Sequence, residues 1–537
     1  GCGLMAGFEL SSQQDNASQL IRGLSEQGLL GVFVASYLLH RCGVRVGTTL
    51  SRPSTLRLEP SAYISRAEMD QAVRSVEAVC QVIASGNAAD LVRHLAQSFR
   101  REGQTPFKLS ENPVAGRTEP VHASVTAAQK QAVFLGHMIS SNDIGLLDPS
   151  LLNLTERERE SLAERLVDPI LIESVPLLSS SGEALNFQVY TLPLTARAIV
   201  KALRNGESAK IVERVNAAVN QFAEEGASVV GLGGLLSVIT RNGLAVRNGF
   251  DELQITTGNT YTVALVVEAV LAAMRERDID PATAKVGIVG AGGNIGATLV
   301  QLLSEYFPRL HLVGRNASIA RVERAAVGAY DAALEQQQLH GSELLTGLAA
   351  EIADFELKAR LASSNGVKMN GEAPSAGARL RKAVIERYGT DPFLAVTGSI
   401  EDLNDCSVIV TASNSITPIL TPSNVGSTTQ IICDVSVPTD VDTNLVTERP
   451  DIAFIRGGVA KAPENNQFTL DVIELPKNHL LACMTETALL GFAGKQGFSA
   501  IGDIHASGVR HCHALGRKYG FSLGYVSLEK PFAIDID

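Results

Sequence analysis

The chain has 537 residues, of which 45% are hydrophobic and 19% are charged, and its formal net charge is −11. This length predicts several domains, and the acidic balance argues against general binding to nucleic acids or to anionic membranes. No apolar run approaches the roughly 18 residues that a membrane-spanning helix needs, so stable membrane insertion is not expected.

Seven cysteines are scattered along the chain, and no two of them form a Cys-x-x-Cys pair. The pattern predicts neither a disulfide framework nor a zinc site, so we expect no metal and a reducing, cytoplasmic setting. The first residues, GCGLMAGFEL, lack the features of a secretory signal. They begin as if within a domain, and we expect an amino-terminal part of the natural protein to precede them.

Residues 1–95 predict a small α+β domain. Two short apolar stretches between positions 43 and 60 are typical of strands. Ser65 and Glu68 then form an S-x-x-E capping box in front of residues with helical spacing. Residues 96–125 are polar and contain several glycines and prolines, which predicts a linker.

Residues 126–282 predict an α/β substrate domain that ends in a long apolar helix. From 283 to 475, short apolar strands alternate with helices, which predicts a doubly wound Rossmann domain with a parallel sheet. We interpret the long interval 316–395 as a mostly helical insertion, and 476–537 as a carboxy-terminal helical segment. The predicted strands lie at 285–290, 310–315, 407–413, 430–438 and 452–458.

A glycine-rich loop, Gly290-Ala-Gly-Gly-Asn-Ile-Gly296, follows the first of these strands and opens a helical pattern. Glycines permit a tight turn, and free N–H groups at a helix start can bind the pyrophosphate of a dinucleotide. The alternative is a plain tight turn, but the strand–turn–helix context favours nucleotide binding. The predicted cofactor-binding residues are Gly290, Gly292, Gly293, Asn294, Ile295, Gly296, Arg315, Asn316 and Thr411.

Arg315 follows the second predicted strand of this domain. An acidic residue at this place would bind the ribose 2′-hydroxyl of NAD, whereas arginine suits the 2′-phosphate of NADP. The alternative is a surface arginine at a strand end. The charge favours NADPH as the cofactor.

Cys483 is the best candidate for a nucleophile. A helix is predicted to begin at or just after it, and a helix amino-terminus stabilises a thiolate and lowers the pKa of a thiol. The alternative is a packed cysteine, which is commoner beside apolar residues. His479 is a candidate base, although a loop histidine is more often structural. Cys406 and Cys433 are assigned to packing in buried strands.

A polar turn, Thr256-Thr257-Gly258-Asn259-Thr260, precedes the long apolar helix of the substrate domain. It either only caps that helix or also faces the cleft between domains. In the second case Thr257, Gly258 and Asn259 are the candidate substrate-contacting residues.

Six segments, in order from about residue 130 to 525, resemble the long-chain fatty acyl–acyl carrier protein reductases of the cyanobacterial type. They are FLGHMIS (134–140), GLGGLLSVI (231–239), ITTGNTYT (255–262), VGIVGAGGNIG (286–296), DVSVPTDV (434–441) and LLACMTETALLGF (480–492). The resemblance implies that Cys483 is the acylated nucleophile, that the glycine loop and Arg315 bind NADPH, and that the product is an aldehyde. The long segment after Arg315 departs from compact members, and His479 has no counterpart.

The first 95 residues also resemble the carboxy-terminal small domain of pyridoxal-phosphate aminotransferases of the acetylornithine type, through GLMAGFEL and TLRLEPSAYISRAEMDQAV. This resemblance implies that Arg57 would bind the α-carboxylate of an amino donor. The lysine that holds pyridoxal phosphate belongs to the large domain, which this sequence lacks. The natural protein would then fuse an aminotransferase to the reductase, with a homodimer formed through the aminotransferase part.

Together these features predict an enzyme that reduces a fatty acyl thioester, carried by acyl carrier protein or coenzyme A, to an aldehyde that the fused aminotransferase converts to an amine. Two other functions stay open. One is a non-covalent NADP oxidoreductase of shikimate-dehydrogenase-like layout. The other is a non-catalytic cofactor-sensing or scaffold domain.

An acyl carrier protein is acidic, so its docking on this acidic chain needs a local basic surface. Arg197, Lys201 and Arg204 fall on one face if 196–204 is helical, and they are the candidate docking residues. The alternative is an ordinary solvated helix face.

Overall fold

The computed structural model describes residues 5–49, 51–96, 130–166, 168–247, 249–340, 345–353, 374–470, 475–494 and 500–524. The chain divides into two compact units. The first comprises Gly1–Ser124, His137–Ile172 and Thr191–Val200, and the second comprises Val125–Gly136, Glu173–Tyr190 and Lys201–Asp537. The predicted linker at 96–125 lies outside the described residues, apart from Ala96.

The first unit has a small antiparallel sheet of order β1-β3-β2 and helices that share one apolar core. The predicted capping box of Ser65 and Glu68 is present at the start of α3. The elements are β1 (Ala6–Glu9), α1 (Gln19–Glu26), α2 (Leu30–Cys42), β2 (Gly47–Thr48), β3 (Thr55–Leu58), α3 (Arg66–Ala84), α4 (Ala88–Ala96), η1 (Ser141–Leu146), η2 (Pro149–Asn153) and α5 (Glu156–Arg165).

The unit boundary differs from the boundary predicted between residues 95 and 126. Residues 137–172 belong with the amino-terminal helices, because Met138, Ile144 and Leu151 join their core. The fully buried Asp148 strengthens this connection, since its carboxylate accepts hydrogen bonds from Ser18 Oγ at 2.5 Å and Leu20 N at 3.0 Å. Such tertiary contacts leave no mark in the local sequence pattern.

A five-stranded sheet of order β5-β6-β4-β7-β8 forms the region predicted as the substrate domain. Strands β4, β7 and β8 run parallel to one another, and α9 follows β8 directly. The elements are β4 (Lys130–Met138), β5 (Ile170–Leu178), β6 (Ala184–Thr195), α6 (Ala196–Asn205), α7 (Ser208–Glu224), β7 (Ala227–Leu232), α8 (Leu235–Ile239), β8 (Gln254–Thr256) and α9 (Asn259–Glu276).

The six-stranded sheet has the order β11-β10-β9-β12-β13-β14, and all its strand pairs are parallel. In chain order this is the 3-2-1-4-5-6 arrangement of dinucleotide-binding domains, so the predicted Rossmann fold is confirmed. The strand order reverses between β9 and β12, where ligands of such sheets bind. The strands are β9 (Lys285–Val289), β10 (Arg309–Val313), β11 (Leu394–Thr397), β12 (Val408–Thr411), β13 (Ile431–Asp434) and β14 (Ala453–Arg456).

The insertion at 316–395 is mostly helical where it is described, but its last residues begin an edge strand, β11, that the sequence reading missed. Residues 354–373 of the insertion lie outside the described residues. The helices of this domain are α10 (Asn294–Leu303), η3 (Asn316–Ser318), α11 (Ile319–His340), α12 (Gly347–Glu351), α14 (Ala376–Tyr388), η4 (Glu401–Leu403) and α15 (Thr443–Glu448).

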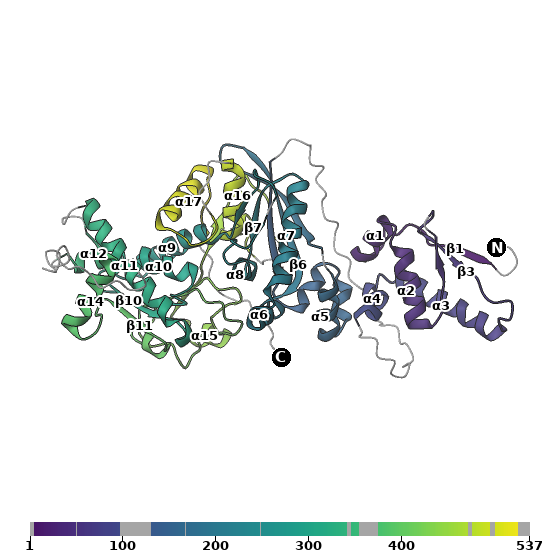
Figure 1. Ribbon diagram of the computed structural model, residues 1–537, viewed down its shortest axis with the longest axis horizontal. Helices are drawn as coiled ribbons and strands as arrows, with labels where there is room; N and C mark the ends of the chain where they lie inside the picture. The colour runs from purple at the N-terminus through teal and green to yellow at the C-terminus, as the bar shows by residue number, and fades with distance from the viewer. Residues whose placement is uncertain are drawn as a thin grey trace. The chain divides into compact units, whose positions relative to one another are not determined.

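The predicted carboxy-terminal helices are present, and both contact α9 (Figure 1). They are accompanied by a small antiparallel sheet of order β16-β15-β17. The elements are β15 (Val459–Lys461), β16 (His479–Leu481), α16 (Ala482–Ala493), α17 (Ala506–Tyr519) and β17 (Ser522–Leu523). Within the described part of the chain, no helix combines the length and apolarity needed to cross a bilayer.

Candidate functional site

The glycine loop after β9 is built so that only glycine fits at its two ends. Gly290 has a φ of +80°, and a Cβ there would lie 2.4 Å from the carbonyl oxygen of Ala412. A Cβ on Gly296 would lie 2.2 Å from the carbonyl oxygen of Gly290. Helix α10 begins at Asn294 with Gly293 as its N-cap, and no side chain caps it. Its first N–H groups are therefore suited to bind a pyrophosphate, and the loop fits a dinucleotide.

Two arginines stand beside this loop. Arg315 is exposed directly after β10, as predicted. Arg321, which the sequence reading missed, lies in the first turn of α11, and its Cβ would be 3.1 Å from a Cβ on Gly292. In the ranges that the structure describes, no ion pair joins either arginine to a carboxylate. The place of Arg321 in the first turn of the helix that follows β10 and η3 is the signal that could have found it.

The side chains of three predicted cofactor residues make other contacts. Thr411 is fully buried and donates to Asp434 Oδ1 at 2.6 Å. Asn316 packs against Gly398, where an added Cβ would lie 2.0 Å from its Oδ1. Ile295 packs against the apolar core. Their role in cofactor binding stays a prediction.

A pair of buried carboxylates stabilises the carboxyl edge of the sheet next to the glycine loop. Asp434 accepts from Thr411 on the neighbouring strand, and Asp440 accepts from Ser413 Oγ at 2.6 Å and from Ser436 Oγ at 2.6 Å. Burial, with the charge of Asp434 as a second cause, raises the pKa of Asp440 to about 6. These bonds fix the loops after β12 and β13 around the glycine loop.

Cys483 is the second residue of α16 and is half-buried. Burial raises the pKa of its thiol to about 12, and the nearby Glu486 carboxylate adds to the rise. The N–H groups of Met484 and of Cys483 itself lower the pKa but do not offset the burial. The predicted helix-start position is confirmed, whereas the predicted lowering of the pKa is outweighed by desolvation. The His479 ring contacts the carbonyl of Lys477 at 2.8 Å.

The polar turn before α9 lies against Cys483. Gly258 has a φ of +70°, and a Cβ there would lie 2.2 Å from both Cα and Cβ of Cys483. Thr257 is buried and donates its N–H to the carbonyl of Ala500 at 3.2 Å. Asn259 is half-buried as the first residue of α9. Gly258, one of the three predicted substrate residues, is therefore in direct contact with the cysteine.

Two backbone connections link this turn to the nucleotide edge. The first runs through residues 500–504. The carbonyl of Ala500 accepts from Thr257 N, and the side chain of Asn294, at the start of α10, bonds to Gly502 O at 2.9 Å and to Ile504 N at 3.1 Å. In the second, Gly457 N donates to Asp434 O and Gly458 O accepts from Ala482 N, each at 2.7 Å. Cys483, the polar turn and the glycine loop are therefore gathered around one edge of the parallel sheet.

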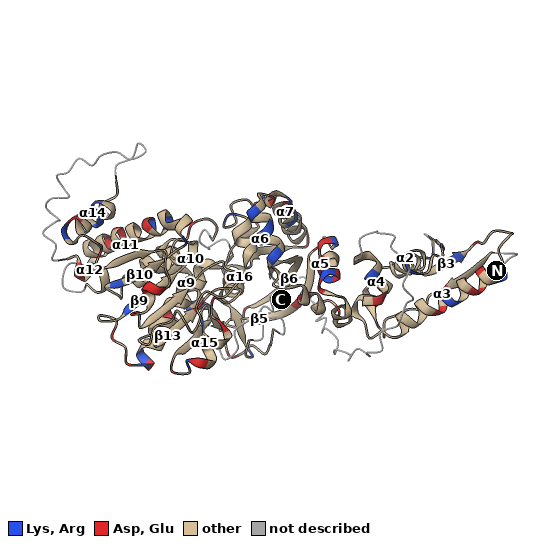
Figure 2. Ribbon diagram, turned by 90° about the horizontal axis from the view of Figure 1, so that it is seen from below, with Lys and Arg blue, Asp and Glu red and all other residues tan. Residues whose placement is uncertain are grey.

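The predicted docking residues lie on α6, and all three are exposed. Figure 2 shows the Lys and Arg positions of α6 in blue. Ile199 and Ala202 are buried on the other side of the helix, so the predicted one-sided basic face is confirmed. Arg197 is not free, because its guanidinium lies 3.8 Å from Glu156 and 3.6 Å from Glu160. Lys201 and Arg204 form no ion pair among the described residues.

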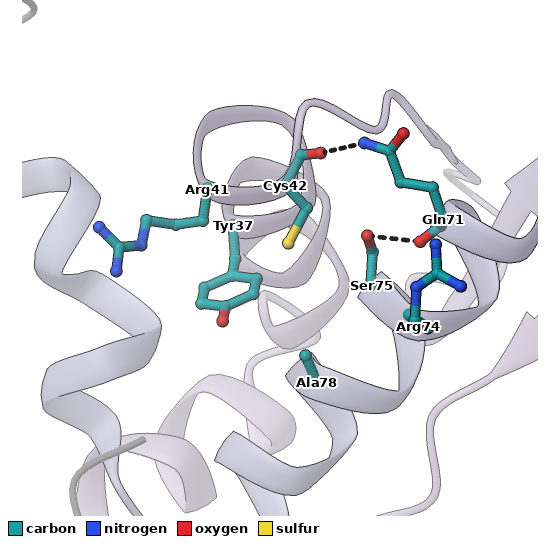
Figure 3. Close-up of a pocket in the computed structure, with 7 residues that line it drawn as sticks. All are labelled: Tyr37, Arg41, Cys42, Gln71, Arg74, Ser75 and Ala78. Atoms are coloured by element: carbon teal, nitrogen blue, oxygen red, sulfur yellow. Dashed lines mark hydrogen bonds between the residues drawn. The ribbon is translucent and has the colours of Figure 1, made fainter. Parts of the chain in front are cut away.

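The amino-terminal unit has a separate cleft of about 200 Å³ between α2 and α3 (Figure 3). Tyr37 and Cys42 line it from α2, and Ser75 and Ala78 line it from α3. It contains none of the predicted site residues. Arg57, the predicted carboxylate-binding residue, lies on β3 and pairs with Glu59 at 3.2 Å.

Among the described residues, one group of side chains has the composition of a metal site. Ligand atoms of His311, Asp405 and Cys406 lie within 4.8 Å of one another. The Asp405 carboxylate already pairs with the ammonium of Lys285, and His311 Nδ1 contacts the carbonyl of Asp402 at 3.0 Å. Two members of the group thus already have protein partners, and the expectation of a metal-independent reaction stays a prediction.

No protein-family model matches the chain. A curated relative, the aminotransferase PigE of Serratia sp. (strain ATCC 39006), is 24% identical over 349 residues, which are 64% of this chain and 33% of the relative. The chain thus spans about a third of the length of that protein.

Two of the solved structures that match show weak similarity to this chain. L-tryptophan dehydrogenase from Nostoc punctiforme is 10% identical, with a TM-score of 0.28 over 73% of this chain and 80% of that one. NAD-dependent malic enzyme from Thermotoga maritima is 11% identical, with a TM-score of 0.29 over 87% of this chain and 96% of that one. Scores this low carry no argument, and the fold assignment rests on the sheet topology described above.

The raised pKa of Cys483 predicts slow alkylation at neutral pH. Because only the thiolate reacts, the rate with iodoacetamide should rise about tenfold per pH unit between pH 7 and 9. Mass spectrometry of the Cys483 peptide at several times and pH values measures that rate, and Cys80, which is exposed, is the internal reference. A plateau of the Cys483 rate below pH 8 would contradict the dominance of burial.

Proposed function

We propose that the chain reduces a fatty acyl thioester to an aldehyde with NADPH, through an acyl thioester on Cys483. The supporting observation is the contact of Cys483 with the Gly258 turn, which is connected to the carboxyl edge of a dinucleotide-type sheet. A nucleophile and a nucleotide loop at one sheet edge are what a covalent reductase needs.

The residues of the chain supply the acyl-transfer step. The Cys483 sulfur forms a bond to the acyl carbon, and the carbon–sulfur bond to the carrier breaks, so that the carrier thiol leaves and takes up the proton. The N–H groups of Met484 and Cys483 stabilise negative charge on the sulfur during attack. A bound NADPH would supply the hydride that converts the enzyme thioester to the oxidation level of the aldehyde.

The fused aminotransferase remains part of this proposal. The curated relative described above is an aminotransferase by name and is about three times as long as the matched segment. We infer that in the whole protein the aldehyde passes to a pyridoxal-phosphate aminotransferase, dimeric through that part, and leaves as an amine. The small antiparallel sheet and helices of residues 1–95 would then be the end of that enzyme.

One observation favours a second function. The high pKa of the Cys483 thiol suits a packed cysteine, as in a non-covalent NADP oxidoreductase that acts on a small carbonyl. In such an enzyme the cysteine could be replaced without loss of activity, so the same variant separates the two functions.

Replacement of Cys483 by alanine should abolish aldehyde formation, because no other described residue at the turn offers a nucleophilic thiol beside Gly258. NADPH affinity should be unchanged, since the glycine loop is untouched. The wild-type chain incubated with an acyl thioester and no NADPH should carry the acyl group on the Cys483 peptide, as seen by mass spectrometry. Cys80→Ala is the matched control; retained turnover in Cys483→Ala would favour the non-covalent enzyme.

Replacement of Arg315 or Arg321 by alanine should weaken NADPH binding roughly ten- to hundredfold, the effect of losing a charge-assisted phosphate contact. NADH binding should change much less, because NADH has no 2′-phosphate. Fluorescence titration gives both dissociation constants, and Arg324→Ala, one turn further along α11, serves as the control. Equal losses for the two cofactors would remove both arginines as phosphate-binding residues.

Charge reversal on α6 tests the carrier partner. Lys201→Glu with Arg204→Glu should raise the KM for an acyl carrier protein substrate, most strongly at low salt, because rim charges steer association and are screened. Arg197 is left in place because its ion pairs belong to the fold. The same acyl group on coenzyme A should show a smaller change. Lys382→Glu with Arg387→Glu on α14 makes the same change in net charge; an equal effect from this pair would contradict docking at α6.

A further inference from the structure

The carboxylate of Glu486 lies beside Cys483, and the proposed reaction gives it no role. Glu486 is on α16, one helical turn after Cys483, and its side chain is fully buried. It accepts hydrogen bonds from Thr256 Oγ1 at 2.5 Å and from Tyr261 N at 2.6 Å. No basic residue pairs with it among the ion pairs of the described chain.

The partners of Glu486 belong to the amino end of α9. Gly258 is the N-cap of that helix and has no side chain to cap it. A side chain could not be added, because a Cβ on Gly258 would collide with Cys483. Tyr261 is the third residue of the helix. The oxygen of an N-cap side chain normally accepts a hydrogen bond from the N–H group at this position, and here Glu486 accepts it. The Glu486 carboxylate therefore stands where the missing cap would be.

The same carboxylate fixes the turn as well as the helix. Gly258 N donates to Thr256 Oγ1 at 2.9 Å, and that hydroxyl donates in turn to Glu486. The backbone from Thr256 to Tyr261 is thereby attached at both ends to one side chain of α16. Any movement of Glu486 would move the turn relative to Cys483.

We propose that Glu486 is a positioning residue for Cys483: its carboxylate caps α9 in place of the side chain that Gly258 lacks and holds the Thr257–Asn259 turn against the cysteine. This inference rests on the proposed function only where turnover is concerned. The geometry of the turn and the reactivity of the thiol can be measured without it.

The charge of Glu486 acts on the thiol as well. The groups that face this position are Cys483 on α16, Cys512 on α17 and, on the side of the cysteine, Arg456 of β14; α9 contributes neutral donors. Burial raises the pKa of Glu486 to about 7, which its hydrogen-bond donors lower only in part. Below that pH the carboxyl gains a proton, the cap weakens and the charge that raises the pKa of Cys483 disappears. Above it the cap is complete.

Glu486→Gln is the test, since it keeps the shape of the side chain and removes its charge. The apparent pKa of Cys483, from the pH profile of iodoacetamide alkylation in the whole chain, should fall by about one unit. Alkylation at pH 8 should accordingly become about tenfold faster. The kcat for aldehyde formation should nevertheless fall about tenfold or more, because the thiol, although more reactive, is no longer held in its productive position.

Thr256→Val separates the cap from the charge and covers the case that Glu486→Gln does not fold. It removes one bond to the carboxylate but keeps the negative charge, so kcat should fall while the pKa of Cys483 does not. Glu268→Gln is the matched control, because Glu268 also lies on a packed helix, α9, and contacts His513 of α17 at 2.9 Å. It should leave both readouts unchanged.

The outcomes are distinct. An unchanged alkylation profile in Glu486→Gln, with or without a lower melting temperature, would overturn the positioning role and leave Glu486 as a structural residue. The expected shift of the profile, in a chain that forms no aldehyde even as wild type, would overturn the reductase proposal and leave the positioning role standing.

Discussion

The site depends on one steric constraint, the contact between the backbone of Gly258 and that of Cys483. The two residues begin two different helices, α9 and α16, and there is no room for a side chain between them. Glycine at 258 allows the left-handed turn and the close approach at the same time. The contact also deprives α9 of its own cap, which is why a carboxylate from the other helix takes that place.

The parallel sheet provides the second level of organisation. Its carboxyl edge holds the glycine loop after β9, and the buried Asp434 and Asp440 fix the two loops that follow β12 and β13. From this edge the chain continues through Gly457 and Gly458 to the backbone of Ala482. The backbone before the cysteine is therefore hydrogen-bonded to the loops at the same sheet edge as the glycine loop.

The sequence predicted the Rossmann sheet well because buried parallel strands are nearly continuous apolar runs, and five of its six strands have that pattern. The sixth, Leu394–Thr397, is a short and only partly buried edge strand, so it was assigned to the helical insertion. The extent of the first compact unit depends on contacts between distant segments. Asp148 bonds to Ser18, which is far away in sequence, and no local pattern records such a contact.

At the site, residue types and helix starts could be predicted, but their electrostatic balance could not. The position of Cys483 at the start of α16 suggested a lowered pKa, whereas its burial in the folded chain raises the pKa instead. In the sequence, Glu486 is simply one polar residue within an apolar helix. Only the packing of α9 shows that it faces a helix amino-terminus.

The charges around Glu486 and Cys483 explain why one group is ionised and the other is not. Two helix amino-termini, each equivalent to roughly half a positive charge, converge on Glu486 and Cys483. The carboxylate can remain buried without a basic partner because the N–H groups of α9 and the Thr256 hydroxyl solvate it. A second buried anion on the adjacent turn of α16 would be repelled by the first, so the resting thiol keeps its proton. Above the pKa of Glu486, which is raised to about 7, the site therefore holds one buried negative charge, and that charge opposes ionisation of the Cys483 thiol.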